Sequence, residues 1–576
     1  MADLLLDIGS TFIKYGIYDK RTNAIHHTES APFPPPETND GVRYTVSLAA
    51  IRERIYEVLH RAKRFACTRA FISVQMHGYV LRDDTGCFTD YVSWRDKNGD
   101  PALPLFDGID FDSLGTSRKS NLPLIKLMPK APKGELFTLG SYVAWLLTGR
   151  NATHITDACA SGFFFADTAG QNEYGKNLIL PVAYKAVTPV GEYDGMLVYS
   201  PTGDHQTGFL GSGAKKDAYL LNIGTATQIS CLHQAGYTEK GCEKRPYFEG
   251  GRLYTVSGLC GGDLLYEGKG SELLWEQLRQ ALAVLPPKQR IVIGGGGAAM
   301  PGGFLTERLK EMGLTCRTET KQIGLEGLKM LAKQSSTKAG TMLSEIAFSN
   351  FPLIAKNSGL AFVIVDNEHG AFDYSQIARL AVEANLTSID LIVRIGDSSR
   401  GHITKLADMG VGGFLLPMTN KPADIEQVIA YAKYPPTGKR GVSTMRAHTL
   451  YDPPRLSDYM VTANKKMKIY AQIETAEGVE NASKILSVPA VDGVLIGPND
   501  LSVDMGCIGD KEKLIAVIKK IAQAAKAADK PFGIITADRV LMAAAKAEGA
   551  EMFCVGSELN MLANGCKNIK EYVSND

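Results

Sequence analysis

The chain has 576 residues, more than one hydrophobic core usually organises, so its length predicts several domains. Its 63 Lys and Arg nearly balance its 62 Asp and Glu, and these charges are scattered, which excludes the basic surface typical of proteins that bind nucleic acid or anionic membranes. The ten cysteines include no C-x-x-C pair, and no apolar run reaches the roughly 20 residues of a spanning helix. We expect a cytoplasmic protein with reduced thiols and small-molecule partners.

The first predicted elements are two strands joined by a polar turn, in the segment LLLDIGSTFIKYGIYD from residue 4 to residue 19. A second version, AYLLNIGTATQISCL, begins at residue 218. Each segment places glycine beside hydroxyl residues in the turn, where backbone N–H groups can approach a polyphosphate closely. One such turn alone is weak evidence, but the repetition predicts a duplicated fold with two phosphate-facing hairpins.

Further phrases follow in order along residues 1–335: SVQMHGYV, VSWRDK, YVAWLLTG, TDACASGFFFAD, TGDHQTGFLGSG and IVIGGGGAAM. With the two hairpins, this series resembles the FGGY carbohydrate kinases. The resemblance implies an α/β fold of the actin-like ATPase (ribonuclease H-like) type, with an amino-terminal lobe at 1–213 and a carboxyl-terminal lobe at 214–335. It also implies ATP with Mg²⁺ as the phosphoryl donor.

Carried over to this sequence, the resemblance makes Asp204 the general base and Asp7 a residue that helps to hold Mg²⁺. Positioning, a base and charge neutralisation are what phosphoryl transfer requires. The other implied residues are Gly9, Ser10, Thr11, Gly224 and Thr225 for the phosphates, Gly294, Gly295, Gly296 and Gly297 for adenosine, and Gln75, His77, Trp94 and Asp96 for substrate hydroxyls.

Two features leave alternatives open. His77 and Trp94 could equally be packing residues, and a glycine run is as often a flexible loop as a nucleotide site. The kinase-like part is shorter than a typical family member, and Lys14 stands where many members have arginine, which loses a planar fork of donors. A sugar- or nucleotide-sensing module without catalytic activity is therefore the alternative to a kinase.

The clearest internal break is KQSSTKAG, residues 333–340. After it, apolar runs of strand length alternate with helical patterns, which predicts a (β/α)8 TIM barrel over residues 336–576. The runs are AGTML, AFVIVD, DLIVRIG, GGFLLPM, KIYAQIE, DGVLIG, PFGIIT and EMFCVG.

Reactive residues fall at the carboxyl ends of these predicted strands, where a barrel carries its active site. They are Glu368, His369, Arg394, Gln472, Glu474 and Asp500. Two carboxylates from neighbouring strands with an amide beside them indicate a site for a hard divalent cation. Taken singly, Glu474 and Asp500 could instead be surface acids, and Asp500 could cap a helix.

The series VDNEHGAF, IVRIGD, ADMGVGGFLLPM, YPPTGKRG, AQIETAEGVEN and IGPNDLSVDMG resembles the HpcH/HpaI family of class II pyruvate aldolases, from about residue 338 onward. The resemblance implies that Glu474 and Asp500 bind a metal such as Mg²⁺, Mn²⁺ or Co²⁺. It implies further that His369, paired with Asp408, moves the proton through a metal-bound water. Arg394 would hold the keto oxygen of the substrate, with Gln472 in support. The family is usually homo-oligomeric, which we expect here through the barrel.

Together these readings predict a kinase fused to an aldolase. We expect phosphorylation of a 2-keto-3-deoxy sugar acid, or of another sugar, and cleavage of a 2-keto-3-deoxy acid to pyruvate and an aldehyde. The reverse order, in which the released aldehyde or a separate ketose is phosphorylated, stays open. A barrel that cleaves citryl or malyl thioesters is a further alternative, although EHGAF and IVRIG are more typical of the aldolases.

Overall fold

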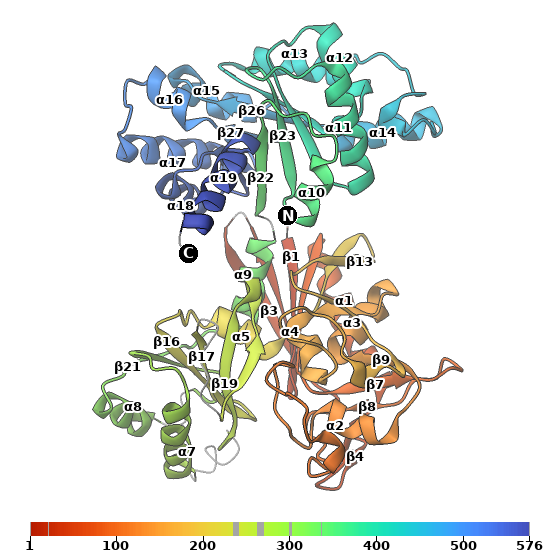
Figure 1. Cartoon of the computed structure of the whole chain (residues 1–576), viewed down its shortest axis with the longest axis vertical. Helices are drawn as coiled ribbons and strands as arrows, with labels where there is room; N and C mark the ends of the chain where they lie inside the picture. The colour runs from red at the N-terminus through yellow and green to blue at the C-terminus, as the bar shows by residue number, and fades with distance from the viewer. Residues whose placement is uncertain are drawn as a thin grey trace. The chain divides into compact units, whose positions relative to one another are not determined.

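The structure, a computed structural model, describes residues 2–20, 22–233, 241–261, 270–298, 302–335 and 337–574. The chain folds into two compact units, Met1–Ser335 and Ser336–Asp576 (Figure 1). Helix α9 (Ile323–Gln334) ends the first unit and strand β22 (Lys338–Leu343) begins the barrel, so most of the KQSSTKAG segment belongs to regular structure. Among the described residues, no helix combines the length and apolarity needed to cross a bilayer.

The first unit contains two sheets of similar topology. The strands of the first sheet are β1 (Ala2–Ile8), β2 (Phe12–Asp19), β3 (Ala24–Pro32), β6 (Arg69–Val74), β13 (Pro189–Tyr193), β14 (Met196–Tyr199) and β15 (Thr202–Gly203). Those of the second are β16 (Ala218–Asn222), β17 (Thr227–His233), β18 (Glu243–Pro246), β19 (Arg252–Leu259), β20 (Arg290–Gly294) and β21 (Thr315–Thr318). In each sheet the first strand pairs antiparallel with the second and parallel with a later one, β6 or β20. This repeat confirms the predicted duplication of the hairpin.

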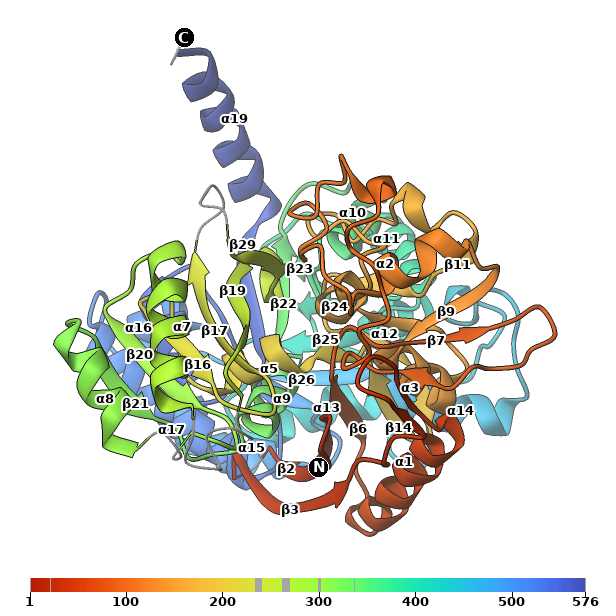
Figure 2. The same ribbon diagram turned by 90° about the horizontal axis from the view of Figure 1, so that it is seen from below.

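Helices pack on both faces of the two sheets, which explains why central strands such as β6 and β16 are largely apolar and almost fully buried. The α-helices described in the first unit are α1 (Leu48–Ala62), α2 (Pro123–Leu127), α3 (Leu139–Thr148), α4 (Ile155–Ala158), α5 (Asp204–Gly211), α7 (Ser271–Val284), α8 (Gly302–Glu311) and α9. Residues of α5 and α9 pack with Leu5 of the first sheet and Leu220 of the second in one core. Helices α7 and α8 pack on the opposite face of the second sheet (Figure 2).

Smaller strands extend the amino-terminal lobe. They are β4 (Thr38–Asn39), β5 (Tyr44–Val46), β7 (Tyr79–Arg82), β8 (Tyr91–Val92), β9 (Gly134–Thr138), β10 (Ala152–His154), β11 (Leu178–Ile179) and β12 (Val182–Tyr184). Six of them form one sheet in the order β11-β9-β7-β8-β5-β4, and β10 pairs with β12.

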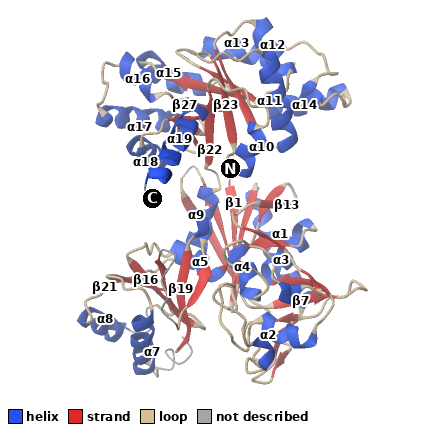
Figure 3. Cartoon of the chain, viewed as in Figure 1, coloured by secondary structure: helices blue, strands red, loops and turns tan. Residues whose placement is uncertain are grey.

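The second unit is a closed barrel of parallel strands in chain order, as the sequence predicted. Its strands are β22, β23 (Phe362–Asn367), β24 (Asp390–Ile395), β25 (Gly413–Leu416), β26 (Lys468–Ile473), β27 (Gly493–Ile496), β28 (Phe532–Ile535) and β29 (Met552–Ser557). Figure 3 shows these strands surrounded by helices. The helices are α10 (Phe351–Asn357), α11 (Tyr374–Thr387), α12 (Arg400–Asp408), α13 (Pro422–Ala432), α14 (Leu456–Lys466), α15 (Ala476–Leu486), α16 (Pro498–Asp504), α17 (Lys511–Ala527), α18 (Arg539–Ala547) and α19 (Glu558–Ser574).

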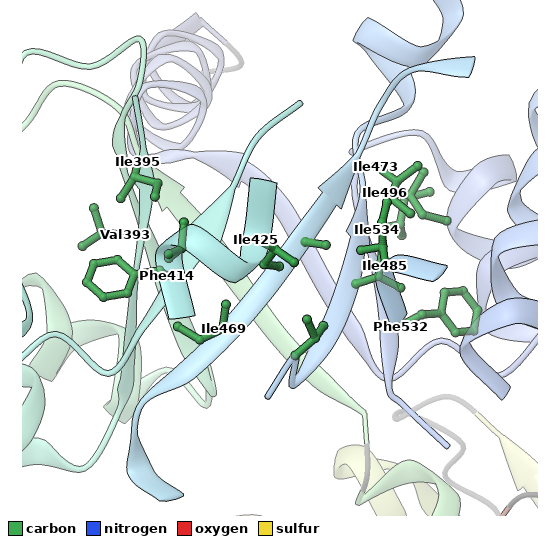
Figure 4. Packing of buried hydrophobic residues seen from close by; sticks show 14 of the residues in the cluster. Val393, Ile395, Phe414, Ile425, Ile469, Ile473, Ile485, Ile496, Phe532 and Ile534 are labelled. Atoms are coloured by element: carbon green, nitrogen blue, oxygen red, sulfur yellow. The ribbon is translucent and has the colours of Figure 1, made fainter. Parts of the chain in front are cut away.

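Side chains alternate between the two faces of each barrel strand. Val393 and Ile395 of β24 belong to the large core that packs against the helices (Figure 4). Ile392, the residue before Val393, belongs to the separate core inside the barrel. The next inward position on β24 is Arg394. The period of two therefore sends a charged side chain to the inside of the barrel near the carboxyl end of its strand.

Candidate functional sites

Two turns face each other across a cavity of about 1060 Å³ in the first unit. Residues Gly9 to Thr11 join β1 to β2, Gly224 and Thr225 follow β16, and all of them line this cavity. Thr11 Oγ1 lies 3.2 Å from Thr225 Oγ1, although the residues are 214 positions apart. Backbone N–H groups in facing turns of this kind suit a polyphosphate chain.

Two partly buried carboxyl groups line the same cavity. Asp7 is near the end of β1 and accepts a hydrogen bond of 2.7 Å from Ser73 Oγ, while Asp204 is the first residue of α5. Burial, and then the negative charge of Asp7, raises the pKa of Asp204 to about 7. Burial also raises the pKa of Asp7. A carboxyl group that titrates near neutral pH is well suited to act as a general base.

Close packing of α5 against α9 fixes the position of these carboxyl groups. A Cβ atom added at Gly327 of α9 would overlap the carbonyl oxygen of Thr207 on α5 and lie 2.8 Å from its carbon. One added at Gly324 would lie 2.8 Å from Asp7 Cγ. The missing side chains let α9 approach both α5, which carries Asp204, and β1, which carries Asp7, more closely than larger residues would allow. Sequence reasoning missed these glycines because their role depends on a neighbouring helix.

An ionic cluster that sequence reasoning also missed forms another part of the cavity wall. The Glu243 carboxylate accepts hydrogen bonds from Lys119 Nζ at 3.0 Å and from Arg245 Nε at 2.8 Å. Lys119 Nζ lies 3.3 Å from His77 Nε2. Burial and the neighbouring cations, Lys119 and then Arg245, hold the pKa of His77 well below its usual range, so this histidine is neutral. Its Nδ1–H donates to the Ala160 carbonyl at 2.9 Å.

Most of the residues expected to meet ATP or a sugar line the cavity, but three do not. Gln75, His77, Trp94, Gly296 and Gly297 are cavity-lining residues.

Asp96, expected to meet substrate hydroxyls, is instead buried in an ion pair with Lys126, with Oδ1 2.9 Å from Nζ, and accepts a hydrogen bond from the Tyr44 amide. These contacts show that Asp96 supports the loop in which it lies, and it does not line the cavity. Gly294 ends β20 beside β16, and a Cβ at Gly295 would overlap Asn222 and Ile223, so both glycines lie against the second turn instead of lining the cavity.

The barrel presents a polar layer near the carboxyl ends of its strands. Asp366 of β23, Arg394 of β24 and Gln472 of β26 each follow an inward apolar residue by two positions. Asp366 and Arg394 are paired in the strand register. The alternation that builds the core thus places these three side chains in one layer above it.

Arg394 is held by two acids. Its Nε and Nη2 atoms donate to Asp366 Oδ1 and Oδ2 at 3.0 and 2.6 Å, and Nε lies 3.3 Å from Glu368 Oε2. Asp366 also accepts from the amides of Glu368 and His369 at 3.1 and 3.2 Å. Burial alone would raise the pKa of Asp366, but the Arg394 guanidinium lowers it below its usual range. Asp366 therefore orients both the arginine and the turn that follows β23, a role that the sequence did not reveal.

The two predicted metal-binding acids follow adjacent strands. Glu474 comes directly after β26 and is buried, whereas Asp500 is in the first turn of α16 after β27 and is exposed. Glu474 Oε1 accepts from the Met418 amide at 2.7 Å, and Oε2 accepts from Gln472 Nε2. Burial raises the pKa of Glu474, and the negative charges of Asp500 and Glu368 raise it further. Mutual repulsion of this kind is relieved by a cation.

The surroundings of Glu474 fit a divalent cation. Gln472 Oε1 is buried without a hydrogen-bond partner among the described residues. A Cβ at Gly497 would overlap the Glu474 carboxylate, so the glycine keeps this space open. Carboxylate and amide oxygens are what hard cations prefer. Where the structure describes side chains, no group of three or more His, Cys, Asp or Glu is placed to hold a metal ion, so the candidate ligand set is limited to the two carboxylates and the Gln472 amide.

The expected pairing of His369 with Asp408 is not observed within the chain. His369 is largely exposed, and its Nε2 lies 3.8 Å from Glu368 Oε2. Asp408 is the last residue of α12, and its carboxylate accepts from Arg440 Nη2 at 2.6 Å, with His448 Nδ1 3.9 Å away. Because α12 runs away from the carboxyl end of β24, its last residue lies far along the helix from the strand end that precedes it.

Comparisons with known proteins distinguish the two units. The family model described as HpcH/HpaI aldolase/citrate lyase matches residues 351–565. A 5-keto-4-deoxy-D-glucarate aldolase of Shigella dysenteriae serotype 1 is 30% identical over 230 residues, which are 39% of this chain and 89% of that protein.

Two solved structures from Lactobacillus acidophilus are similar to the first unit. A ligand-bound xylulose kinase has a TM-score of 0.52 at 15% identity, and a gluconate kinase has a TM-score of 0.52 at 14% identity. Each match covers 58% of this chain and 89% of the other. At these identities the likeness shows the fold of the first unit, which is that of the sugar kinases.

Proposed function

Because this chain belongs, through its carboxyl-terminal barrel, to the HpcH/HpaI aldolase/citrate lyase family, we propose that it is a bifunctional enzyme with a retro-aldol site and a kinase site. The barrel cleaves a 2-keto-3-deoxy sugar acid, or its phosphate, to pyruvate and an aldehyde. The first unit transfers the γ-phosphoryl group of ATP to a sugar or to such a sugar acid.

In the barrel, Glu474 and Asp500 would hold a divalent cation, with Gln472 in support. Such a cation stabilises the negative charge of an enolate by Lewis-acid chemistry. Arg394, oriented by Asp366, donates hydrogen bonds to the keto oxygen as charge develops there. His369 takes the proton from the C4 hydroxyl, the C3–C4 bond breaks, and its electron pair remains on the pyruvyl fragment. No Schiff-base lysine is required.

In the first unit, Asp204 takes the proton from the acceptor hydroxyl as that oxygen attacks the γ-phosphorus. The two turns hold the phosphates through their N–H and hydroxyl groups, and Gly296 and Gly297 leave space beside them for adenosine. Asp7 would help to hold Mg²⁺, which neutralises the phosphate oxygens. The pKa of about 7 for Asp204 supports its role as the base.

We further propose that phosphorylation precedes cleavage, with the product of the kinase as the substrate of the aldolase. The curated relative is named for a keto-deoxy sugar acid, which is the same chemical class as the proposed intermediate. In the opposite order, cleavage comes first and the released aldehyde leaves the kinase in phosphorylated form. Pyruvate release then does not depend on ATP, whereas in the proposed order it does.

The contact of Thr11 with Thr225, in the cavity that Asp204 also lines, is the observation that carries the kinase assignment. The test is to supply 2-keto-3-deoxy acids to the full chain with and without ATP and Mg²⁺, and to follow pyruvate and ADP together. Asp204→Asn should remove sugar-dependent ADP formation while ATP still binds, and Glu474→Gln should remove pyruvate release.

Equal pyruvate release from phosphorylated and unphosphorylated acids would contradict the proposed order. A wild-type protein that binds ATP and a sugar but never forms ADP would instead support a sensing module, with catalysis confined to the barrel.

A further inference from the structure

We propose that the kinase cavity selects a polyhydroxy acid and that Lys119 and Arg245 bind its carboxylate. This inference rests on the proposed kinase function and names the substrate class of that site. It follows from the charge of the ionic cluster in the cavity wall and from unpartnered polar atoms that line the same cavity.

Glu243 holds the two cations in place and is fully occupied in doing so. Its Oε1 accepts from Ser117 Oγ at 3.0 Å, Lys119 Nζ at 3.0 Å and Ser257 Oγ at 3.1 Å, and its Oε2 accepts from Arg245 Nε at 2.8 Å. All five side chains line the cavity. One carboxylate thus faces two cations, and the cluster retains a net positive charge.

Both cations keep donors for a ligand. An ammonium group has three N–H donors, and Lys119 uses one toward Glu243 and one toward His77, which leaves one for a ligand. A guanidinium has five, and Arg245 uses one toward Glu243 and one toward Gln228 Oε1 at 3.3 Å. A carboxylate accepts from both kinds of donor, with the strength of a charge-assisted hydrogen bond.

His77 does not change this balance. Its Nδ1–H is donated to a backbone carbonyl, so Nε2 is the lone-pair acceptor that faces Lys119, and the ring adds no positive charge. Asp112 also lines the cavity, but its carboxylate is paired with Lys244 at 2.7 Å. Arg118 lines the cavity as well, and its guanidinium is paired with Asp107 at 2.8 Å. The excess positive charge of this part of the wall therefore belongs to Lys119 and Arg245.

Other lining groups are placed to meet hydroxyl groups. Gln75 Oε1, Thr116 Oγ1 and Asn121 Oδ1 are buried, and none has a hydrogen-bond partner among the residues that the structure describes. Gln75 and Thr116 are each only 2% exposed. A buried acceptor without a partner costs free energy that a donor from a ligand recovers. A sugar acid supplies these hydroxyl donors together with the carboxylate.

The test compares each acid with a neutral sugar of the same chain length. ADP formation is measured with a 2-keto-3-deoxy aldonate, an aldonate and the matching neutral ketose, for the wild type and for Lys119→Gln. We expect the acids to have the higher kcat/KM in the wild type. Lys119→Gln should raise KM for the acids about tenfold or more, while kcat for the acids and both constants for the ketose change less than about twofold. Lys119→Arg should restore much of the acid affinity.

Lys63→Gln is the matched control, because Lys63 forms an exposed ion pair with Asp194, Nζ 2.9 Å from Oδ2, and neither residue lines the cavity. It removes the same charge and should leave the acid KM unchanged. Retained turnover of the ketose by Lys119→Gln shows that the variant is folded.

A wild type that phosphorylates the neutral ketose as well as the acids would overturn this inference and leave the kinase assignment intact. If no compound yields ADP, the kinase assignment fails, and thermal shift with each acid decides the carboxylate site. A rise in Tm that is specific to acids and lost in Lys119→Gln supports the site, and its absence overturns it.

Discussion

Replacement of Asp366 by asparagine should destabilise the barrel unit and impair its chemistry together. Asp366 accepts four hydrogen bonds, two from Arg394 at 3.0 and 2.6 Å and two from the amides of Glu368 and His369. The side chains of Asp366 and Arg394 are only 5% and 10% exposed, so the ion pair is buried. The asparagine keeps one acceptor but turns an N–H group toward the guanidinium.

Breaking one partner of a buried pair typically costs about 3 kcal/mol or more. For a domain of this size, each kcal/mol lowers Tm by roughly 2–4 °C, so the barrel transition should fall by roughly 6–12 °C. Pyruvate release should fall by about a hundredfold or more, because Arg394 is then free to turn toward Glu368.

The two unfolding transitions can be separated because the three tryptophans, Trp94, Trp145 and Trp275, are all in the first unit. Tryptophan fluorescence follows that unit, and differential scanning calorimetry follows both. Asp366→Asn should shift the calorimetric transition that has no counterpart in fluorescence. Asp390→Asn is the control, since it makes the same change in an exposed ion pair with Lys338, worth at most about 1 kcal/mol.

The stabilisation by Asp366 should also depend on pH. A carboxyl group whose pKa is lowered in the folded state adds stability above its unfolded pKa, near 3.8, and loses it as the pH falls through the folded value. The Tm difference between wild type and Asp366→Asn should therefore be full at pH 6 and shrink below pH 3.8. A shift no larger than that of Asp390→Asn, or one that does not depend on acid pH, would refute this account of Arg394.

Three further outcomes are expected. The kinase rate should rise with pH through about 7, because Asp204 acts as a base only when its carboxyl group has lost the proton; a flat profile between pH 5.5 and 8.5 would contradict this. Gly327→Ala should lower the fluorescence-detected Tm and the kinase rate without affecting pyruvate release from an acid supplied already phosphorylated, since the added Cβ would overlap Thr207, whereas Gly303→Ala, with no atom closer than 3.7 Å, should be nearly neutral. Chelation and dialysis should abolish pyruvate release, and adding Mg²⁺, Mn²⁺ or Co²⁺ should restore it. Undiminished release after chelation would contradict the assignment of a metal to Glu474.

Local patterns in the sequence were sufficient to predict the architecture. The two glycine-containing hairpins became β1–β2 and β16–β17, and the eight apolar runs became the strands of the closed barrel. These features depend on the period of two and on turn residues, which a short window of sequence contains. The same alternation explains why Arg394 and Gln472 point into the barrel.

Contacts between distant segments could not be predicted in this way. The family resemblance implied that Asp96 meets the sugar, but Lys126, on the separate helix α2, pairs with it. Asp408 was expected to pair with His369, but within this chain it pairs with Arg440, which lies in the loop after α13.

The sequence by itself determined where the strands and turns lie and which residue types reach the strand ends, because these depend on neighbours a few positions away. Only the tertiary structure decided which charges face one another. Lys119 meets Glu243 across 124 positions, and Thr11 meets Thr225 across 214. Such pairs depend on how whole sheets and helices pack, and ion pairs leave no periodic pattern in the chain that would reveal their partners.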